Sequence, residues 1–233
     1  MLRTHKLGEA DRIVTLLTRD NGRVRAVAKG VRRTMSKFGS RLEPFTHVDV
    51  QLAEGRNLDT ITQAETFTPF ASALGADYER YTAGTVMLET AERLVTEEKQ
   101  PSVQQFLLLV GGLRAMVGGE RGPGQVLDSY LLRSLAVAGY APSFDACAHC
   151  GLEGPHRWFN PSMGGMLCTT CRLPGSASPS PQVIATMSAL LTGDWPVVEA
   201  ADPRQLREAS GLVSAFLHWH LERGLRSLEH VER

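Results

Sequence analysis

The chain has 233 residues, of which 42% are hydrophobic and 21% are charged. This length suits two small domains better than one domain of about 100 to 150 residues, and the composition excludes a disordered or fibrous protein. The sequence contains no run of 18 apolar residues, and its charged start is unlike a secretory signal. We therefore expect a cytoplasmic protein that does not enter a membrane.

An even balance of 25 basic and 25 acidic residues hides a strong asymmetry. Residues 1–42 contain 11 Lys and Arg against 3 Asp and Glu, a net charge of +8, so residues 43–233 carry −8. A basic N-terminal part of this kind is suited to binding a polyanion. We expect the acidic remainder to serve contacts with proteins.

Short strands are predicted from residue 12 to residue 67. The aliphatic run Ile13–Leu17 is followed by the hairpin signal Asp20-Asn21-Gly22 and by a second strand, Val24–Lys29. In that second strand Val24, Ala26 and Ala28 alternate with Arg25 and Lys29, so one face is apolar and the other is charged.

The alternation returns in Phe45–Leu52 and Leu58–Phe67, which a turn at Glu54–Asn57 connects. Four or five short strands within about 65 residues are typical of a small barrel or sandwich, and a five-stranded barrel of the oligonucleotide-binding (OB) type fits this length. We therefore expect an OB-fold β-barrel over residues 1–70.

Helices replace strands after Asp77, which is placed to cap the first of them. In that helix Tyr81, Thr85 and Leu88 begin the expected apolar face. A second helix is predicted over Ser102–Val117 and a third over Gly124–Ala138, each followed by glycine.

The remaining predicted helices follow a segment that contains all four cysteines. The Pro- and Ser-rich run Pro174–Pro181 has the composition of a linker, helices are expected over Gln182–Leu191 and Arg204–Arg223, and the polar last ten residues are expected to fray. The predicted fold class is α+β: an N-terminal OB-fold β-barrel, then an α-helical domain in two parts, 71–143 and 174–233, with a four-cysteine zinc motif inserted at 144–173.

The cysteines occur as two Cys-x2-Cys pairs separated by 17 residues, which is the spacing of a zinc site. Disulfides are disfavoured in a cytoplasmic protein, and four thiolates complete a tetrahedral shell that leaves no position for water. We therefore expect one structural Zn²⁺ per chain, with His149 and His156 as spare ligands; four buried cysteines without metal are the alternative. The predicted ligands are Cys147, Cys150, Cys168 and Cys171.

A second constellation lies in the basic N-terminal part. The loop between Gly30 and Pro44 combines cations with Ser36, Ser40 and an aromatic residue, a combination that follows a phosphate backbone and offers a ring to a base. An ordinary solvated loop, with the ring packed beneath it, is the alternative. The predicted DNA-binding residues are Arg3, Lys6, Arg12, Arg25, Lys29, Arg32, Arg33, Lys37, Phe38 and Arg41.

Motifs of common enzymes are absent from the sequence. It has no Gly-x4-Gly-Lys-Ser/Thr phosphate loop, no Gly-x-Ser-x-Gly elbow and no His-Glu-x2-His helix, and no cluster of carboxylates at metal spacing. We therefore expect a binding protein and no catalytic residues. An RNA-binding OB-fold protein with a zinc ribbon remains the rival interpretation, and a nuclease or glycosylase is the rival enzyme.

Four segments resemble the RecO family of DNA repair and recombination proteins: Gly8–Thr18, Gly22–Arg33, Ser36–Gly39 and Leu42–Phe45. The resemblance implies a non-enzymatic, nucleoid-associated mediator that binds single- and double-stranded DNA and anneals complementary strands. It also implies three protein partners: single-strand-binding protein, through the acidic C-terminal tail of that protein; RecR; and, indirectly, RecA, which the mediator helps to load.

The resemblance carries two further expectations. Family members usually have several more residues before Leu2, which form the first barrel strand. We therefore expect a shortened first strand here, and closure of the barrel depends on that strand. Some members lack the cysteines, so zinc is expected to support the helical domain. An acidic tail needs an apolar groove with a local cation, and helix-borne candidates for that cation are Arg80, Arg93, Arg114 and Arg133.

Overall fold

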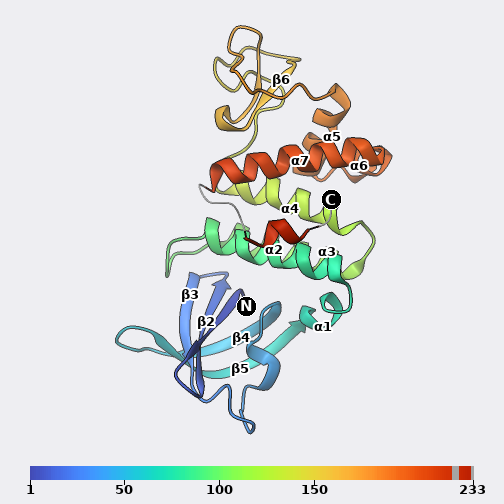
Figure 1. Cartoon of the computed structure of the whole chain (residues 1–233). Coiled ribbons are helices and arrows are strands. Elements are labelled where there is room, and N and C mark those ends of the chain that lie inside the picture. The colour runs from blue at the N-terminus through green and yellow to red at the C-terminus, as the bar shows by residue number, and fades with distance from the viewer. Residues whose placement is uncertain (222–225, 232–233) are drawn as a thin grey trace. The chain divides into compact units, whose positions relative to one another are not determined.

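The structure is a computed structural model that describes residues 1–221 and 226–231. The chain divides into two compact units, Met1–Glu120 and Arg121–Arg233, and each is described by itself (Figure 1). The predicted end of the last long helix near Arg223 lies outside the described residues, as does part of the expected frayed end. Within the described residues, no helix combines the length and apolarity that crossing a membrane requires.

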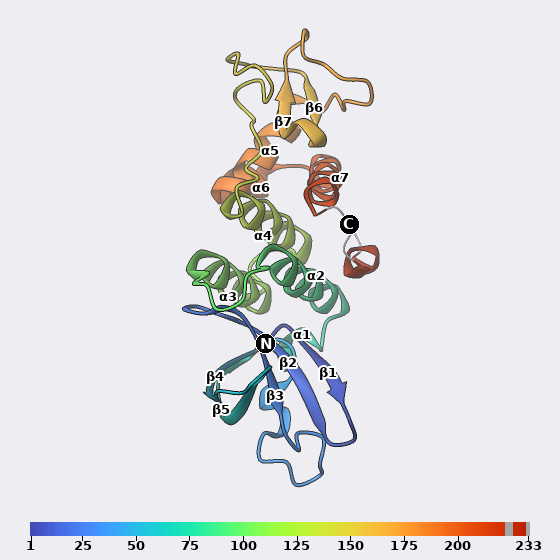
Figure 2. The ribbon, with the colours of Figure 1, turned by 90° about the vertical axis from the view of Figure 1, so that its left-hand side faces the viewer.

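The first unit contains a five-stranded sheet in the order β1-β2-β3-β5-β4. Neighbouring strands are antiparallel except β3 and β5, which are parallel; Figure 2 shows the β1–β3 meander beside the β4–β5 hairpin. The strands are β1 (Arg3–Leu7), β2 (Asp11–Thr18), β3 (Gly22–Ala28), β4 (Thr46–Ala53) and β5 (Asp59–Pro69).

This strand order suits a partly open barrel of the OB class, but a closed barrel is not shown. Among the described residues β1 and β4 form no ladder with each other. Met1 joins the two edges: its carbonyl oxygen accepts a hydrogen bond from the Phe45 amide, and its amino group donates to the Thr46 carbonyl oxygen at 3.0 Å. The next amide, that of Leu2, donates to the Thr15 carbonyl oxygen. The first strand, β1, was not predicted from its residues, because most of its side chains are exposed and its apolar alternation is weak.

The predicted alternation of β3 is confirmed. Val24, Ala26 and Ala28 are buried, whereas Arg25 is exposed. Their buried side chains pack against Val14 and other apolar residues in the core of the sheet. This core fixes which side of β3 carries its charges, because a strand presents successive side chains on opposite faces.

Three helices belong to the same unit: α1 (Phe70–Leu74), α2 (Tyr78–Leu94) and α3 (Val103–Gly118). As predicted, Asp77 caps α2, its carboxylate accepting a hydrogen bond from the Arg80 amide. The predicted apolar face of α2 is wrong at its start, since Tyr81 is 46% exposed. The buried face instead includes Ala83 and Val86, and at Gly84 a Cβ would lie 3.0 Å from the Phe45 ring.

The segment that joins α2 to α3 is fastened to the β2–β3 turn. The Ser102 amide donates to the Arg19 carbonyl oxygen, and Glu98 forms β-bridges with Gly22 and Arg23. Gly22 has a φ of +55°, and a Cβ there would collide with the carbonyl oxygen of Gln100. A glycine is therefore required at this turn both by its backbone conformation and by the close approach of the segment.

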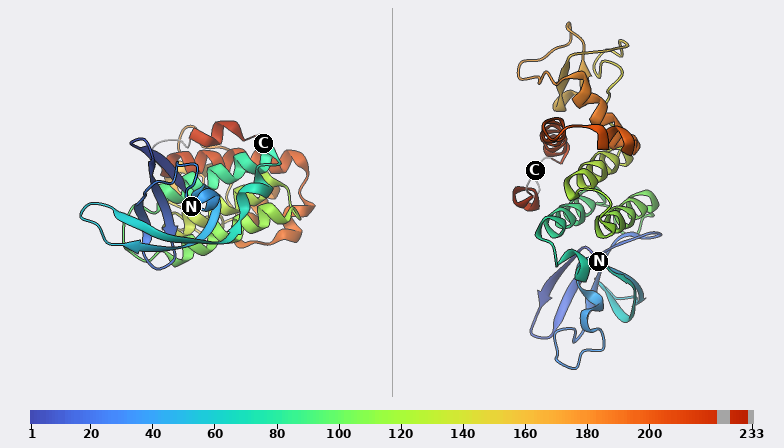
Figure 3. Two further views of the ribbon diagram at one scale, coloured as in Figure 1. Left: turned by 90° about the horizontal axis from the view of Figure 1, so that it is seen from below. Right: turned by 90° about the vertical axis from the view of Figure 1, so that its right-hand side faces the viewer.

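The second unit packs four helices around one core and carries a small two-stranded sheet. Helix α7 lies beside α4 and α5 (Figure 3), and α6 is a short helix that the sequence did not predict. Buried residues of the core include Leu131 on α4, Met187 on α5 and Phe216 on α7. The elements are α4 (Pro123–Val137), β6 (Trp158–Asn160), β7 (Gly165–Leu167), α5 (Pro181–Thr192), α6 (Trp195–Ala200) and α7 (Pro203–His220).

The expected linker Pro174–Pro181 is not a free connection. Ala177 and Phe159 exchange two backbone hydrogen bonds of 2.9 Å, Arg157 donates to the Ser178 hydroxyl, and Pro179 is buried. The segment connects the cysteine segment to α5 without a helix or strand of its own, and it also forms a bridge to β6, which satisfies backbone groups that a flexible linker would leave in water.

The fastening at Gly22 can be tested by substitution. Gly8 has almost the same φ, +57°, but nothing lies within 4 Å of a Cβ built there. We expect Gly8→Ala to lower the free energy of unfolding by about 1 kcal/mol, the cost of a left-handed alanine, and Gly22→Ala to lower it by roughly 1 to 3 kcal/mol more because of the collision. Urea unfolding of both variants measures the difference, and equal losses would contradict the fastening.

Candidate nucleic-acid interface and metal centre

The loop that follows β3 is held against the β1–β2 turn by hydrogen bonds. The Gly30 amide donates to the Asp11 carboxylate at 2.7 Å. The guanidinium of Arg32 donates to the carbonyl oxygens of Gly8 and Glu9 at 3.2 and 2.8 Å. These contacts place the loop at a defined position at this end of the sheet.

Six exposed cations surround this turn and loop, and we call them the basic surface. Lys6, Lys29 and Arg33 have no acidic partner within the described part of the chain. The other three donate hydrogen bonds to neutral carbonyl oxygens, such as Lys37 to that of Thr62 at 2.8 Å, so their charge is not compensated. The basic surface consists of Lys6, Lys29, Arg32, Arg33, Lys37 and Arg41.

The other three predicted DNA-binding cations are paired with acids of the same unit. Arg3 contacts Glu92 at 2.9 Å, and Arg25 contacts Glu98 at 2.7 Å. A third pair joins Arg12 on β2 to Glu43. All three acids belong to the net acidic part of the sequence, so the local positive charge is smaller than the net charge of residues 1–42 suggested.

The prediction that Phe38 offers its ring to a base is wrong. Its side chain is only 2% exposed and packs in the core of the sheet with Leu42, on the short helix η1 (Gly39–Leu42). Burying a large aromatic side chain is strongly favourable, so the ring anchors the loop. The Lys37 ammonium lies 5.0 Å from the ring centroid.

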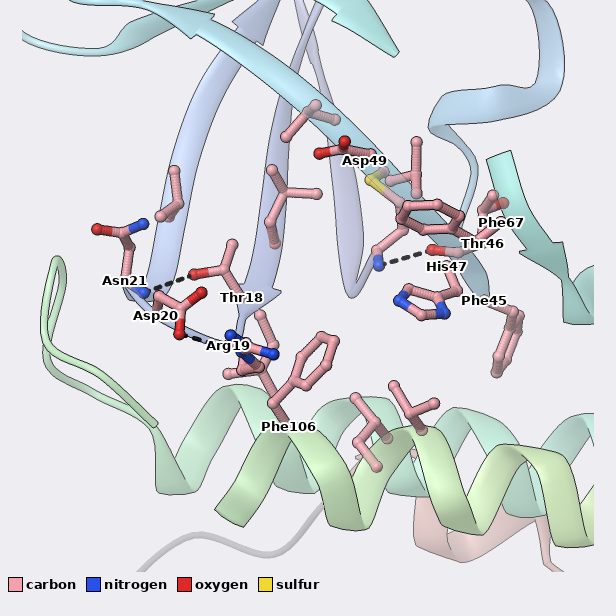
Figure 4. Close-up of a pocket in the computed structure, with 18 of the residues that line it drawn as sticks. Thr18, Arg19, Asp20, Asn21, Phe45, Thr46, His47, Asp49, Phe67 and Phe106 are labelled. Atoms are coloured by element: carbon pink, nitrogen blue, oxygen red, sulfur yellow. Dashed lines mark hydrogen bonds and ion pairs between the residues drawn. The ribbon is translucent and has the colours of Figure 1, made fainter. Parts of the chain in front are cut away.

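An aromatic pocket of about 810 Å³, which no sequence pattern indicated, lies in the same unit between the sheet and α3 (Figure 4). The ring of His47 lies 5.3 Å from that of Phe67 and 5.8 Å from that of Phe106. Burial lowers the pKa of His47, which favours a neutral ring. Charged residues of both signs line the pocket, among them Arg114 and Asp49, so it does not favour anions.

The four cysteines meet in the second unit. Their sulfur atoms all lie within 4.8 Å of one another, and the Sγ atoms of Cys150 and Cys168 are 3.9 Å apart. Four sulfurs placed about 2.3 Å from a zinc ion form a tetrahedron with edges of about 3.8 Å. The Gly151 amide donates to the Cys147 carbonyl oxygen, closing the turn that brings the first pair together.

The pKa values of these thiols also favour the binding of a cation. Backbone hydrogen bonds, chiefly from Cys168, lower the pKa of Cys147 to about 5. A hydrogen bond with the Cys168 side chain is the main cause that raises the pKa of Cys171 to about 12. Four thiolates side by side repel one another, so protons or a metal ion must balance their charge, and metal binding releases those protons.

The cysteine segment contains a small core of its own. Leu167 packs with Cys147 and Cys168, and Trp158 packs against this cluster while the guanidinium of Arg172 stacks 3.7 Å from its ring centroid. The Phe159 ring, 6.2 Å from that of Phe216, connects the segment to α7. A core this small indicates that a metal ion would contribute much of the local stability.

We expect Cys168→Ser to lose bound metal and to lower the melting temperature, because the remaining three thiols no longer complete the shell. His149→Ala is the control, since that side chain is exposed and outside the sulfur cluster. Elemental analysis should find one zinc ion per chain in the wild type and in the control. Unchanged melting of Cys168→Ser, or wild-type protein free of zinc, would contradict the metal assignment.

The chain matches two family models. Residues 1–70 match the model described as Recombination protein O N terminal, and residues 75–229 match Recombination protein O C terminal. Together these matches cover both the sheet that carries the basic surface and the helices that surround the cysteine segment.

Curated relatives are similar over the full length of the chain. It is 78% identical over 236 residues to the DNA repair protein RecO of a Nocardioides species, covering all of this chain and 97% of the relative. It is 62% identical over 239 residues to that of Streptomyces coelicolor and 61% identical over 233 residues to that of Thermobifida fusca, covering 96% of each. The chain therefore belongs to the RecO family of DNA repair proteins.

Proposed function

We propose that the protein is a mediator of DNA repair and homologous recombination that binds single- and double-stranded DNA through the basic surface and anneals complementary strands. The observation that carries the proposal is the set of six exposed, uncompensated cations around one end of the sheet. Lys and Arg that contact phosphates release condensed counterions, which makes binding strong and independent of sequence.

Annealing follows from the same charges without chemistry on the DNA. Two strands repel each other through their phosphates, and a surface that neutralises some phosphates of both lowers this repulsion. Base pairing then supplies the specificity, and no bond is made or broken by the protein. We accordingly assign no catalytic residue and place the protein with DNA, at the nucleoid in the cytoplasm.

Two other functions predict different results. An RNA-binding protein of the same fold would bind an RNA oligomer at least as tightly as the DNA oligomer of equal sequence. A nuclease or glycosylase would alter labelled DNA in the presence of Mg²⁺. Intact DNA and no preference for RNA support the mediator.

The cysteine segment would contribute to this function only by stabilising the second unit. We propose that Cys147, Cys150, Cys168 and Cys171 hold one structural zinc ion, which would supply local stability to the second unit. A shell of four thiolates leaves no open coordination position for a substrate. The basic surface belongs to the other unit, so loss of zinc should affect DNA binding less than it affects folding.

The basic surface predicts a strong dependence of DNA affinity on salt. If its six cations engage single-stranded DNA, each contributing ~0.7 to the slope, log affinity should fall by roughly four per decade of salt. Reversing two cations without ionic partners, Lys29→Glu with Arg33→Glu, should flatten this slope by at least about one and abolish annealing. Stability should change little, because exposed charges contribute little to it. Fluorescence anisotropy at several salt concentrations measures the slope.

A matched control makes the same change in net charge at another place. Arg204→Glu with Arg207→Glu alters two exposed cations in the first turns of α7. We expect this variant to keep the wild-type slope and to anneal DNA. Equal losses in both double variants would show that overall charge, and not the basic surface, governs binding.

The proposal also includes protein partners. We propose that it engages the acidic tail of single-strand-binding protein and, with RecR, helps RecA to replace that protein on DNA. Of the four helix-borne cations considered for the tail, Arg80 contacts Asp77 and Arg93 contacts Glu89. Arg114 and Arg133 are exposed, and Arg114 also lines the aromatic pocket.

We expect tail binding to be separable from DNA binding. The variant Lys29→Glu with Arg33→Glu should keep wild-type affinity for the tail peptide, because neither cation lies on a helix. Arg114→Ala and Arg133→Ala, measured separately by calorimetry, should show which helix holds the peptide, the affected variant losing about tenfold or more, as expected for a charge-assisted contact. Loss of peptide binding in the loop variant would mean that one shared basic surface serves both ligands.

A further inference from the structure

A line of cations continues from the basic surface along the outer side of β3. Arg25 and Lys29 lie on the same face of this segment, about 13 Å apart at ~3.3 Å per residue. Arg3 and Arg25 also flank Thr15 in the register of β1, β2 and β3. The exposed fractions of their side chains, 54% for Arg3 and 51% for Arg25, leave both within reach of a ligand.

In the free protein Arg25, the last cation of this line, forms an ion pair with Glu98. The Glu98 carboxylate lies 2.7 Å from the guanidinium of Arg25 and 3.8 Å from that of Arg23. Arg23 also donates a hydrogen bond of 2.6 Å to the carbonyl oxygen of Thr96. Glu98 thus takes the position on Arg25 that a phosphate oxygen would take.

The backbone holds Glu98 in this position, but its side chain is exposed. The segment around it is fastened to the β2–β3 turn through Gly22 and Ser102, so the carboxylate stays near Arg25. Its side chain is 38% exposed, whereas that of Glu92, the partner of Arg3, is 19% exposed. Exposed ion pairs are weak, so an incoming phosphate can displace Glu98 by rotation of one side chain.

We propose, building on the DNA-binding function above, that single-stranded DNA extends from the basic surface along β3 to Arg25, and that Glu98 is an internal competitor for this cation. Glu98 lowers the affinity for DNA and shortens the track that DNA occupies. Glu92, which is more buried, keeps Arg3 neutralised. The contact limits non-specific binding by a protein that has to release DNA after annealing.

Substitution of Glu98 tests the competition. We expect Glu98→Gln to tighten binding of a single-stranded oligonucleotide about two- to fivefold, the range for losing one exposed ion pair, and to steepen the salt slope by ~0.7 as Arg25 joins the contact. Glu97→Gln is the matched control: it makes the same charge change at the adjacent, exposed residue, which forms no ion pair with the described residues. Anisotropy titrations of the full chain measure both quantities.

Arg25→Gln, introduced into the wild type and into Glu98→Gln, distinguishes competition for Arg25 from a general effect of net charge. It should cost less affinity in the wild type, where Glu98 already contacts Arg25, than in Glu98→Gln, where it should remove the gain. Equal affinities of the Glu98→Gln and Glu97→Gln variants, or an equal cost of Arg25→Gln in both backgrounds, would overturn the proposal. If Lys29→Glu with Arg33→Glu still flattens the salt slope and abolishes annealing in that case, the proposed DNA-binding function stands and only the competition by Glu98 fails. If wild-type binding shows no dependence on salt, both proposals fail.

Discussion

Burial of Phe38 beneath the loop after β3 is the contact on which the chemistry of the N-terminal unit depends. Six cations on one short loop and its neighbouring turn repel one another, and a loop without an anchor would spread them apart in water. The Phe38 ring and Leu42 fix the loop to the core of the sheet, and hydrogen bonds from Gly30 and Arg32 fix it to the β1–β2 turn. The cations are therefore held together by the fold itself, so the proposed contact with DNA would not have to order them.

Much of this arrangement followed from local patterns. The alternation in β3, the cap at Asp77 and the two Cys-x2-Cys pairs each depend on neighbours in sequence, and the structure confirms each pattern. The short helices α1 and α6 escaped prediction because their position is set by packing with distant residues, and not by their own periodicity. The strand β1 was expected only from the family resemblance, because most of its side chains are exposed.

The errors have one common physical origin, which is that long-range pairing is invisible in composition. Phe38 stands among cations and serines in the sequence, yet its ring is buried because the loop folds back over the sheet. Pro174–Pro181 reads as a linker, but Ala177 completes a bridge with Phe159. The aromatic pocket joins His47, Phe67 and Phe106 from three elements, and no spacing within one segment could have indicated it.

The distribution of charge shows most clearly that long-range pairing cannot be predicted from composition. It also explains why the basic surface contains fewer cations than the sequence predicted. A net charge of +8 over residues 1–42 treats every cation alike, whereas in the structure Glu43, Glu92 and Glu98 reach back and neutralise Arg12, Arg3 and Arg25. Long-range attraction of a polyanion depends on the summed field, but the tight contact depends on which cations have no internal anion. These three acids of the first unit therefore leave, of the nine cations predicted to bind DNA, the six of the basic surface without an acidic partner among the described residues.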